Sequence, residues 1–332
     1  YFHQRRARRA VGLMADLTLF SENRGAIRFR GEGGQRKNGG QKNGETHERI
    51  ICVMKFGVNA FLWTAQFSET HLPVMERVKS WGYDGIELFI ANPADFPVQT
   101  IYQGLVRYGL GLTVVTVAGP DTNPISPDAA VRAHAVRHFE DCIKRVADAG
   151  GEMLCGPVYA PLGVFTGTRR SEDEWKRGVE FFQKLGPALD SNRVTLAVEP
   201  LNRFETYFLN TAADAVKLCM EVDHPRVGIL FDTFHANIEE KSVPDAYRRV
   251  GPFLKHVHTC ENDRGTPGTG HVDWGGVFQA LDDIDYDGWL TIESFGAAIV
   301  EIAAAARIWR DLEKDGDTLA IDGLRFLKSA FA

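Results

Sequence analysis

The stretch RVGILFDTFHANIEE, residues 226–240, decides the fold that this sequence predicts. Its first half is a continuous apolar run, which is typical of a strand buried on both faces in a parallel sheet. The run ends at Asp232, and His235 and Asn237 follow within five residues. A carboxylate and an imidazole where a buried strand ends are typical of the catalytic rim of a β/α barrel. The structural alternative is a strand that simply ends in a helix-capping Asp.

Seven more strand-like runs lie on either side of this stretch, and amphipathic segments alternate with them. The predicted strands are 55–61, 84–90, 112–119, 153–160, 195–201, 227–234, 254–260 and 289–295. The predicted helices lie near 72–82, 98–109, 128–149, 171–189, 211–222, 243–251, 274–284 and 299–313. Eight strand–helix alternations predict a single-domain (β/α)₈ TIM barrel over residues 54–332. A doubly wound open sheet is disfavoured because no G-x-G-x-x-G follows the first strand.

Composition excludes several classes of function. A hydrophobic fraction of 44% and a charged fraction of 25% are typical of a globular protein. The formal net charge of −6 disfavours nucleic acid as a partner. No apolar run approaches the roughly 18–20 residues that cross a bilayer, so we expect no membrane association. The five cysteines are widely spaced and form no C-x-x-C pair, which predicts reduced thiols and a cytoplasmic location.

Residues 1–53 differ from the rest of the chain. They contain 11 Lys and Arg against 5 Asp and Glu, so the remainder carries a net charge of −12. Residues 31–48 are glycine-rich and polar without any period, which is typical of disorder. Met54 stands directly before the first predicted strand, where a natural initiator would stand. We therefore expect residues 1–53 to be a disordered or non-native extension, with a transit peptide as the alternative.

Four consecutive predicted strands end in residues that bind metals. These residues are Glu199, Asp232, His258 and Glu293. The carboxyl ends of barrel strands meet at one rim, so we expect the four side chains to lie together. Unpaired carboxylates in such apolar surroundings would be costly, and a divalent cation would neutralise them. Three carboxylates with one imidazole suit Mn²⁺, Mg²⁺ or Co²⁺ better than structural zinc.

Strand parity distinguishes the residues close to these four. His256 and His258 face the same side of their strand, and His258 is the nearer to the mouth of the barrel. We therefore expect His256 to be a buried, hydrogen-bonded residue one layer deeper. Asp232 and His235 are an odd number of positions apart, so one regular strand cannot point both inward. Asp232 is then the metal ligand, and His235 belongs to a loop above the metal.

The segments LAVEPLNRFE (196–205), ILFDTFHANIEE (229–240), HVHTCENDRGTPGTG (256–270) and LTIESF (290–295) carry a family resemblance. They resemble the signature segments of the D-tagatose, D-allulose (psicose) and L-ribulose 3-epimerases, which are ketose 3-epimerases with xylose-isomerase-like barrels. The resemblance covers residues 55–313. It implies an isomerase that epimerises a free ketose at C3 through a cis-enediolate, as a homodimer or homotetramer.

The resemblance also implies roles for single residues. One Mn²⁺, or Co²⁺, would be bound by Glu199, Asp232, His258 and Glu293, and the two glutamates would form the acid–base pair. The substrate would be held by Glu205, His235 and Arg264, which all occur at the matching spacing.

Residues outside these segments stay open. Glu87 is either a further contact in the site or a partner behind the metal ligands, and Trp63 either lines the sugar pocket or packs. Residues 265–270 (GTPGTG) predict a turn and not a phosphate cradle, because no P-loop lysine and helix start follow them. This favours free sugars over sugar phosphates. Residues 55–67 and 155–167 depart from the family pattern, so the preferred ketose is not predicted.

Three other functions compete with this one. The nearest is another sugar or sugar-phosphate isomerase of the same barrel group, hydroxypyruvate isomerase-like or inosose dehydratase-like. A nuclease of the endonuclease IV type would need a basic face, which a charge of −12 on the folded part opposes. A silent sugar-binding module would have no need of both Glu199 and Glu293.

Overall fold

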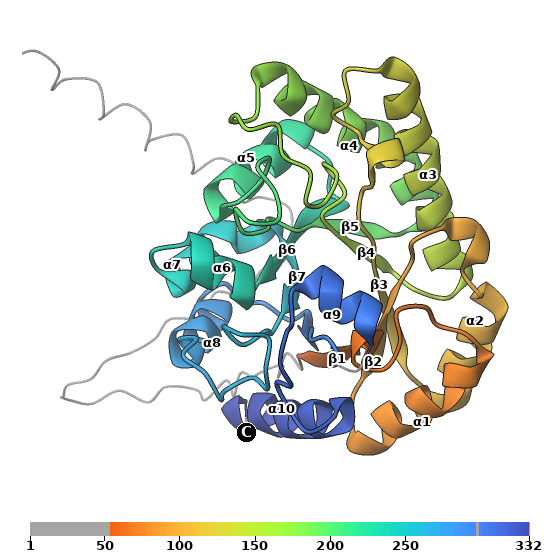
Figure 1. Cartoon of the computed structure of the whole chain (residues 1–332), viewed down its shortest axis with the longest axis vertical. Helices are drawn as coiled ribbons and strands as arrows, with labels where there is room; N and C mark the ends of the chain where they lie inside the picture. Colours follow the sequence, from red (N-terminus) through yellow and green to blue (C-terminus); the bar gives the residue numbers. More distant parts are fainter. Residues whose placement is uncertain (1–53, 297–298, 332) are drawn as a thin grey trace, which may run out of the picture. The chain divides into compact units, whose positions relative to one another are not determined.

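The computed structural model describes residues 54–296 and 299–331, so the expectation that residues 1–53 are an extension lies outside the described part. Eight parallel strands close into a barrel in chain order, with β1 paired to β8 (Figure 1). The predicted (β/α)₈ barrel is thus confirmed. The strands are β1 Lys55–Asn59, β2 Gly85–Phe89, β3 Gly111–Val115, β4 Met153–Gly156, β5 Thr195–Val198, β6 Val227–Asp232, β7 Leu254–His258 and β8 Trp289–Ile292.

Several strands end earlier than predicted, and β4 shows the reason most clearly. The sequence predicts a strand to residue 160, but β4 ends at Gly156, whose φ of +120° is open to glycine and rarely to other residues. Pro157 follows and has no N–H to donate to a ladder. The chain therefore leaves the barrel wall there and forms part of the rim.

Helices surround the strands, and several of them begin at side-chain caps. Ser171 accepts a hydrogen bond from the backbone N–H of Glu174, whose side chain returns the contact. Thr211 and Asp273 each accept a hydrogen bond from a backbone N–H in the first turn of the helix that follows. The helices are α1 Leu72–Trp81, α2 Val98–Tyr108, α3 Ala129–Asp148, α4 Glu172–Asn192, α5 Ala212–Val222, α6 Thr233–Glu239, α7 Val243–Val250, α8 Trp274–Asp283, α9 Val300–Ala306 and α10 Gly316–Ala330.

The final helical region was predicted wrongly. Instead of one helix near 299–313, α9 stops at Ala306, because Arg307 adopts a left-handed conformation with φ of +59°. A separate helix, α10, begins after Asp315, whose side chain accepts from the backbone N–H of Thr318. In Figure 1, α10 takes its place in the ring of helices around the barrel, whereas α9 is drawn over the strands.

Side chains along each strand point alternately outward, towards the helices, and inward, into the barrel. Outward-facing side chains of the strands pack against the helices in one large apolar core. Inside the barrel, Val115, Cys155, Ala197 and Leu230 form a smaller apolar layer. Polar residues stand at and above this layer, which places them at the carboxyl ends of the strands. Among the helices of the described residues, none combines the length and the apolarity needed to cross a membrane.

Candidate active site

The structure brings the four predicted strand-end residues together. Asp232 and His258 are the last residues of β6 and β7, and Glu199 and Glu293 directly follow β5 and β8. All four are buried, and one possible ligand atom from each lies within 4.8 Å of the others. The register of four adjacent parallel strands accounts for this convergence, because it sets their carboxyl ends side by side.

The centre of this group is the Nδ1 atom of His258. It lies 3.7 Å from Glu199 Oε1, 3.9 Å from Asp232 Oδ2 and 3.6 Å from Glu293 Oε1. His258 Nδ1 and Glu199 Oε1 are fully buried and have no hydrogen-bond partner within residues 54–296 and 299–331. Buried polar atoms are nearly always satisfied, so two converging lone pairs without partners need an explanation. A divalent cation fits them, since imidazole nitrogen and carboxylate oxygens are among its usual ligands.

Electrostatics point the same way. Burial raises the pKa of Glu199 to about 7 and that of Glu293 to about 8, because desolvation disfavours their charged forms. Burial also raises the pKa of Asp232. Burial alone would lower the pKa of His258, but the Glu87 and Glu293 carboxylates raise it well above its usual value. The site therefore gathers positive charge, either as protons or as a cation.

Asp232 has two tasks at once. Its Oδ1 accepts a hydrogen bond of 2.7 Å from the backbone N–H of Phe234 and so caps α6. Its Oδ2 faces the cluster, 3.9 Å from His258 Nδ1. The capping alternative is thus compatible with a place in the site. The helix that Asp232 caps also corrects the prediction of a loop at His235. The residues after Asp232 form α6, and His235 lies in its first turn.

His235 faces the same cluster from above. Its Nε2 lies 3.7 Å from Glu199 Oε1 and 3.8 Å from Asp232 Oδ2. Its Nδ1 accepts from the backbone N–H of Asn202 at 3.2 Å, so the ring presents Nε2 to the site. Burial lowers the pKa of His235 well below its usual value, and the Arg264 charge adds to this effect. The imidazole is therefore neutral at physiological pH.

Arg264 and Glu205 complete the group predicted to hold the substrate. Arg264 Nη2 lies 3.3 Å from His235 Nε2 and 3.7 Å from Glu205 Oε1. The guanidinium lies between the rings of Phe234 and Phe295, at 4.3 Å and 4.4 Å from their centroids. Such cation–π contacts fix its position over the site. The sequence analysis missed both aromatic partners, although Phe295 ends one of the recognised segments.

A cavity of about 300 Å³ opens beside these side chains. This volume is at the lower end of small-molecule sites. Its polar lining comes from β5, α6, β8 and their loops, and its apolar lining comes largely from the first half of the barrel and from α9. The polar side of the cavity includes Glu199, Glu205, His235, Arg264 and Glu293, and the apolar side includes Phe61, Phe89, Val115 and Ile302.

Trp63, left open by the sequence, packs. Its ring lies 6.0 Å from that of Trp81, and its indole N–H donates to Asp317 Oδ1 at 2.7 Å. It does not line the cavity described above.

The 265–270 loop is a turn, as predicted. The Glu261 carboxylate lies inside it and accepts from the backbone N–H groups of Gly268 and Val272 and from the Trp274 indole. These donors are therefore occupied by a side chain of the protein.

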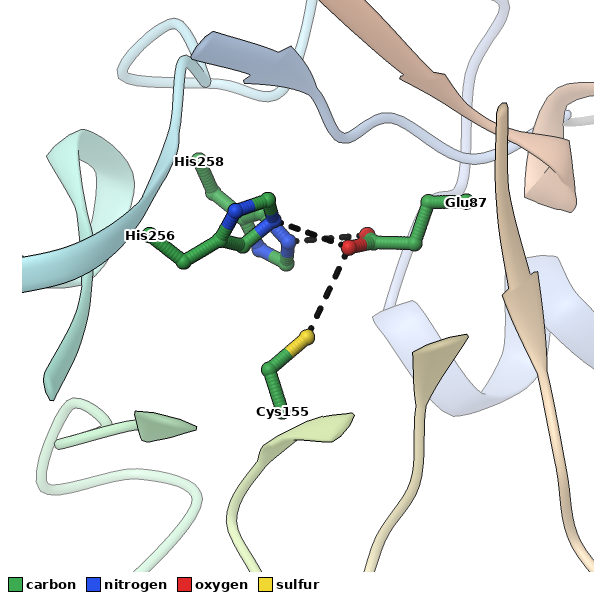
Figure 2. A group of neighbouring side chains, drawn as sticks. All are labelled: Glu87, Cys155, His256 and His258. Atoms are coloured by element: carbon green, nitrogen blue, oxygen red, sulfur yellow. Dashed lines mark hydrogen bonds and ion pairs between the residues drawn. The ribbon is translucent and has the colours of Figure 1, made fainter. Parts of the chain in front are cut away.

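A second buried group lies behind His258, and it settles where Glu87 stands. Glu87, Cys155, His256 and His258 meet in the barrel, with Glu87 accepting from both histidines (Figure 2). His256 is thus the deeper, hydrogen-bonded residue that was predicted. Glu87 does not line the cavity. Of its two predicted roles, the structure supports that of a partner behind the cluster.

Comparison with known proteins gives consistent matches. Residues 75–330 match the family described as xylose isomerase-like TIM barrel. A probable ketose 3-epimerase from Synechocystis sp. is 38% identical over 84% of this chain and 97% of its own length. A D-psicose 3-epimerase from Ruminiclostridium cellulolyticum is 31% identical over 81% and 93%. The crystal structure of a D-allulose 3-epimerase from Methylomonas sp. with D-allulose superposes with a TM-score of 0.80 at 30% identity, covering 84% of this chain and 97% of the other.

Proposed function

This chain belongs to the ketose 3-epimerases of the xylose isomerase-like TIM barrel family, which are isomerases, and on that premise we propose a metal-dependent, two-glutamate mechanism for it. In this mechanism Glu199 and Glu293 exchange the proton at C3 of a free ketose through a cis-enediolate. The observation that carries the proposal is the pair of buried, unpartnered lone pairs on His258 Nδ1 and Glu199 Oε1, next to a cavity of about 300 Å³.

The proton transfer needs one carboxyl group on each side of the substrate. The proton on C3 is acidic because the neighbouring C2 carbonyl stabilises the resulting carbanion as an enediolate. One glutamate removes this proton, and the other delivers a proton to the opposite face, with the roles exchanged in the reverse reaction. Glu199 and Glu293 suit this, since both carboxyl groups are buried and line the cavity. In the metal-free protein, burial raises the pKa of Glu199 to about 7 and that of Glu293 to about 8, because desolvation disfavours their charged forms.

The residues that would hold the cation are Glu199, Asp232, His258 and Glu293. A bound divalent cation would act as a Lewis acid that polarises the carbonyl and stabilises the negative charge of the enediolate. Three carboxylates and one imidazole suit Mn²⁺ first, with Co²⁺ or Mg²⁺ as alternatives.

Three further residues would hold the sugar. His235, neutral and aimed by Asn202, can donate from Nε2 to a substrate oxygen near C1 or C2. Arg264 and Glu205 lie beside it and line the same cavity. The apolar wall on the other side excludes water, which protects the enediolate from stray protonation. A free sugar is favoured over a phosphorylated one, because the Glu261 carboxylate occupies the backbone N–H of Gly268 in the glycine-rich loop and that of Val272 just after it.

Cys260 is near the cluster but is not a nucleophile in this proposal. Its Sγ lies 3.3 Å from Asp232 Oδ2, and burial raises the pKa of the thiol well above its usual value. The thiolate is the reactive form, so this side chain stays a neutral donor.

We also propose a cytoplasmic homodimer or homotetramer. Four cysteines of the described residues are free and buried, which supports a reducing compartment. Phe204 and Trp309 are large and mainly exposed, at 73% and 76%, which supports a contact with another subunit. Light scattering after size exclusion measures the mass, and a monomer at micromolar concentration would contradict the oligomer.

The test of the function is epimerisation in D₂O. The metal-free protein is loaded with Mn²⁺ and incubated with D-allulose, D-fructose, D-tagatose and L-ribulose, and the products are followed by NMR. We expect interconversion of C3 epimers with deuterium at C3, and folded but inactive Glu199→Gln and Glu293→Gln variants. Glu172→Gln on the exposed start of α4 is the matched control and should keep wild-type turnover.

Other outcomes of this experiment identify the competing functions. Aldose products with deuterium at C2, together with ketose labelled at C1, would indicate an aldose–ketose isomerase. Binding of sugar without any exchange would indicate a sugar-binding module. Near-normal turnover in either glutamine variant would exclude the two-glutamate mechanism.

A further inference from the structure

The Glu87 carboxylate is buried inside the barrel and is surrounded by donors. Its Oε1 accepts from His258 Nε2 at 2.8 Å and from Asn59 Nδ2 at 2.8 Å. Its Oε2 accepts from His256 Nε2 at 2.9 Å and from Thr113 Oγ1 at 2.9 Å. Figure 2 shows both histidine rings directed at this one side chain from the opposite side of the barrel. An ionised carboxylate has no hydrogen to donate, so each ring must supply an Nε2–H.

This contact determines which nitrogen of His258 faces the site. A neutral imidazole carries one N–H, and when Nε2 donates, Nδ1 is left with a lone pair. Nδ1 is the atom that lies 3.6 to 3.9 Å from the three carboxylates of the site. It is fully buried and has no partner among the described residues. The Glu87 contact therefore leaves a lone pair aimed at the place where a cation would bind.

We propose that Glu87 is a positioning residue, which fixes the tautomer and the ring orientation of His258 so that Nδ1 can bind the cation. This inference rests on the cation site of the proposed function. Carboxylates that hold the second nitrogen of a metal-bound histidine typically change metal affinity by ten- to a hundredfold. Glu87 stands on β2 and His258 on β7, 171 residues later, so the first half of the barrel prepares a ligand of the second half.

The same four residues could instead be taken for a second metal site, because their possible ligand atoms also lie within 4.8 Å of one another. The hydrogen bonds oppose this. Both oxygens of Glu87 already accept two short bonds each, and the histidine nitrogens involved are the ones that donate them. The Cys155 thiol has two acceptors within reach, the backbone carbonyl of Val114 at 3.4 Å and Glu87 Oε2 at 3.5 Å. An ion there would break four bonds to form its own.

His256 makes a sharp test possible. Its Nδ1 is buried without a partner, so the ring can carry its proton there instead of on Nε2. In Glu87→Gln, the amide oxygen can stay on the His258 side while the amide N–H donates to His256 Nε2. The amide thus keeps the orientation of His258 and loses only the charge. Glu87→Ala loses both.

The experiment titrates Mn²⁺ into metal-free protein by calorimetry. For Glu87→Ala we expect the dissociation constant to rise about ten- to a hundredfold, and for Glu87→Gln less than about tenfold. The matched control is Thr113→Val, which removes another donor to Glu87 but not the contact with His258. Its dissociation constant should stay within about threefold of wild type, even if its melting temperature falls. An equal loss of affinity in the control would mean a general packing effect and would overturn the proposal.

A second measurement covers the case in which Glu87→Ala does not fold. The nitrogen shifts of ¹⁵N-labelled histidines report the tautomer of His258 in metal-free and Mg²⁺-loaded wild type and in Glu87→Gln. We expect the Nε2–H tautomer in Mg²⁺-loaded wild type. In the metal-free sample we expect the same Nε2–H, with a second proton on Nδ1 wherever the pH lies below the raised pKa of His258. An Nδ1–H tautomer in metal-free wild type would overturn the inference, as would wild-type Mn²⁺ affinity in both Glu87 variants. If wild type itself bound no Mn²⁺, the proposed function would fail at the cation site, which is a distinguishable result.

Discussion

The two halves of the barrel share one architecture but differ in what their strand ends carry. The ends of β5 to β8 present Glu199, Asp232, His258 and Glu293 to one point. The ends of β1 to β4 present mainly apolar side chains, which wall the cavity. A cation needs several ligands within a few ångströms, and the four neighbouring strands β5 to β8 supply them at one rim. The eight strand–helix units of the fold thus do not need to share the functional side chains evenly among them.

Glu87 sharpens this contrast, because it is a buried glutamate of the first half. Burial raises the pKa of Glu199 and Glu293, to about 7 and about 8. Burial would raise the pKa of Glu87 too, but the charges and hydrogen bonds of His258 and His256 hold it well below its usual value. A buried carboxyl group stays charged when hydrogen-bond donors contact both of its oxygens. A buried carboxyl group that lacks such donors binds a proton or a cation instead.

The largest effect should follow from changing a strand end of the second half. Asp232→Asn keeps an oxygen that can cap α6, since Asn and Asp cap about equally well. It removes the negative charge that faces the cluster, so we expect weaker Mn²⁺ binding and a loss of kcat of about 10²- to 10⁴-fold. Steady-state kinetics and calorimetry measure both quantities.

The matched control for that variant is Asp273→Asn at the start of α8, where the same change is made at an exposed cap that does not line the cavity. It should keep wild-type kinetics. Wild-type kinetics in Asp232→Asn itself would show that Asp232 is only a helix cap and not one of the four cation ligands that the second half is proposed to supply.

A change in the first half should act on the substrate and not on the cation. Phe61 lines the cavity and packs against the rings of Phe89 and Phe295, at 5.3 Å and 5.4 Å. Phe61→Ala opens the apolar wall, so KM should rise about tenfold while Mn²⁺ affinity stays unchanged. A parallel loss of Mn²⁺ affinity would contradict the division between the two halves.

The sequence predicts the second half better than the first, for a physical reason. Each of the four strand ends can be recognised locally, as a polar residue that terminates a buried apolar run. The order of the strands in the barrel then places these four residues side by side at one rim. The Glu87–His258 bond and the position of Arg264 between Phe234 and Phe295 join segments far apart in the chain. No local pattern encodes such contacts.

The errors in the predicted helices have a similar origin. α6 begins directly after Asp232, although a strand to residue 234 and a loop at His235 were predicted, because one carboxyl oxygen of Asp232 is available as a cap while the other faces the site. α10 buries Leu319, Leu324 and Leu327 in the shared core, yet its start at Asp315 depends on the break after α9. Helix ends depend on single conformations such as that of Arg307, which periodicity does not reveal.

The raised pKa values of the second half predict how stability depends on pH. In the folded, metal-free protein the carboxyls of Glu199 and Glu293 hold protons up to pH of about 7 and about 8, set by their pKa values, whereas the unfolded chain has already released them. The folded state binds more protons in this window, so the free energy of unfolding should fall as pH rises from 6.5 to 9. The raised pKa of His258 acts in the same direction.

Glu87 does not titrate in this window, because its lowered pKa and the pKa of a glutamate in the unfolded chain both lie below it. The lowered pKa values of His235 and His256 oppose the fall in stability only near pH 6.5, where the unfolded imidazoles release their protons. Thermal melts of metal-free protein should show Tm falling over the window, and saturating Mn²⁺ should raise Tm most at pH 9, since the cation binds the deprotonated carboxylates. The Glu199→Gln/Glu293→Gln double variant is the control and should have a flatter profile. A flat profile in the wild type would contradict the raised pKa values.

The smallest effect is expected at Trp63, where the first half meets α10. The Trp63 indole N–H donates to Asp317 Oδ1. The same carboxylate also forms an ion pair with Arg77, whose Nε lies 3.3 Å from Oδ2. Trp63→Phe removes one hydrogen bond and leaves Asp317 with its second partner, so the free energy of unfolding should fall by about 1 kcal/mol. Urea melts measure this change. Because the side chain packs against Trp81 and does not line the cavity, KM for the preferred ketose should stay within about twofold. A larger rise in KM would show that Trp63 lines the sugar pocket. The first half would then contact the substrate through more than its apolar wall.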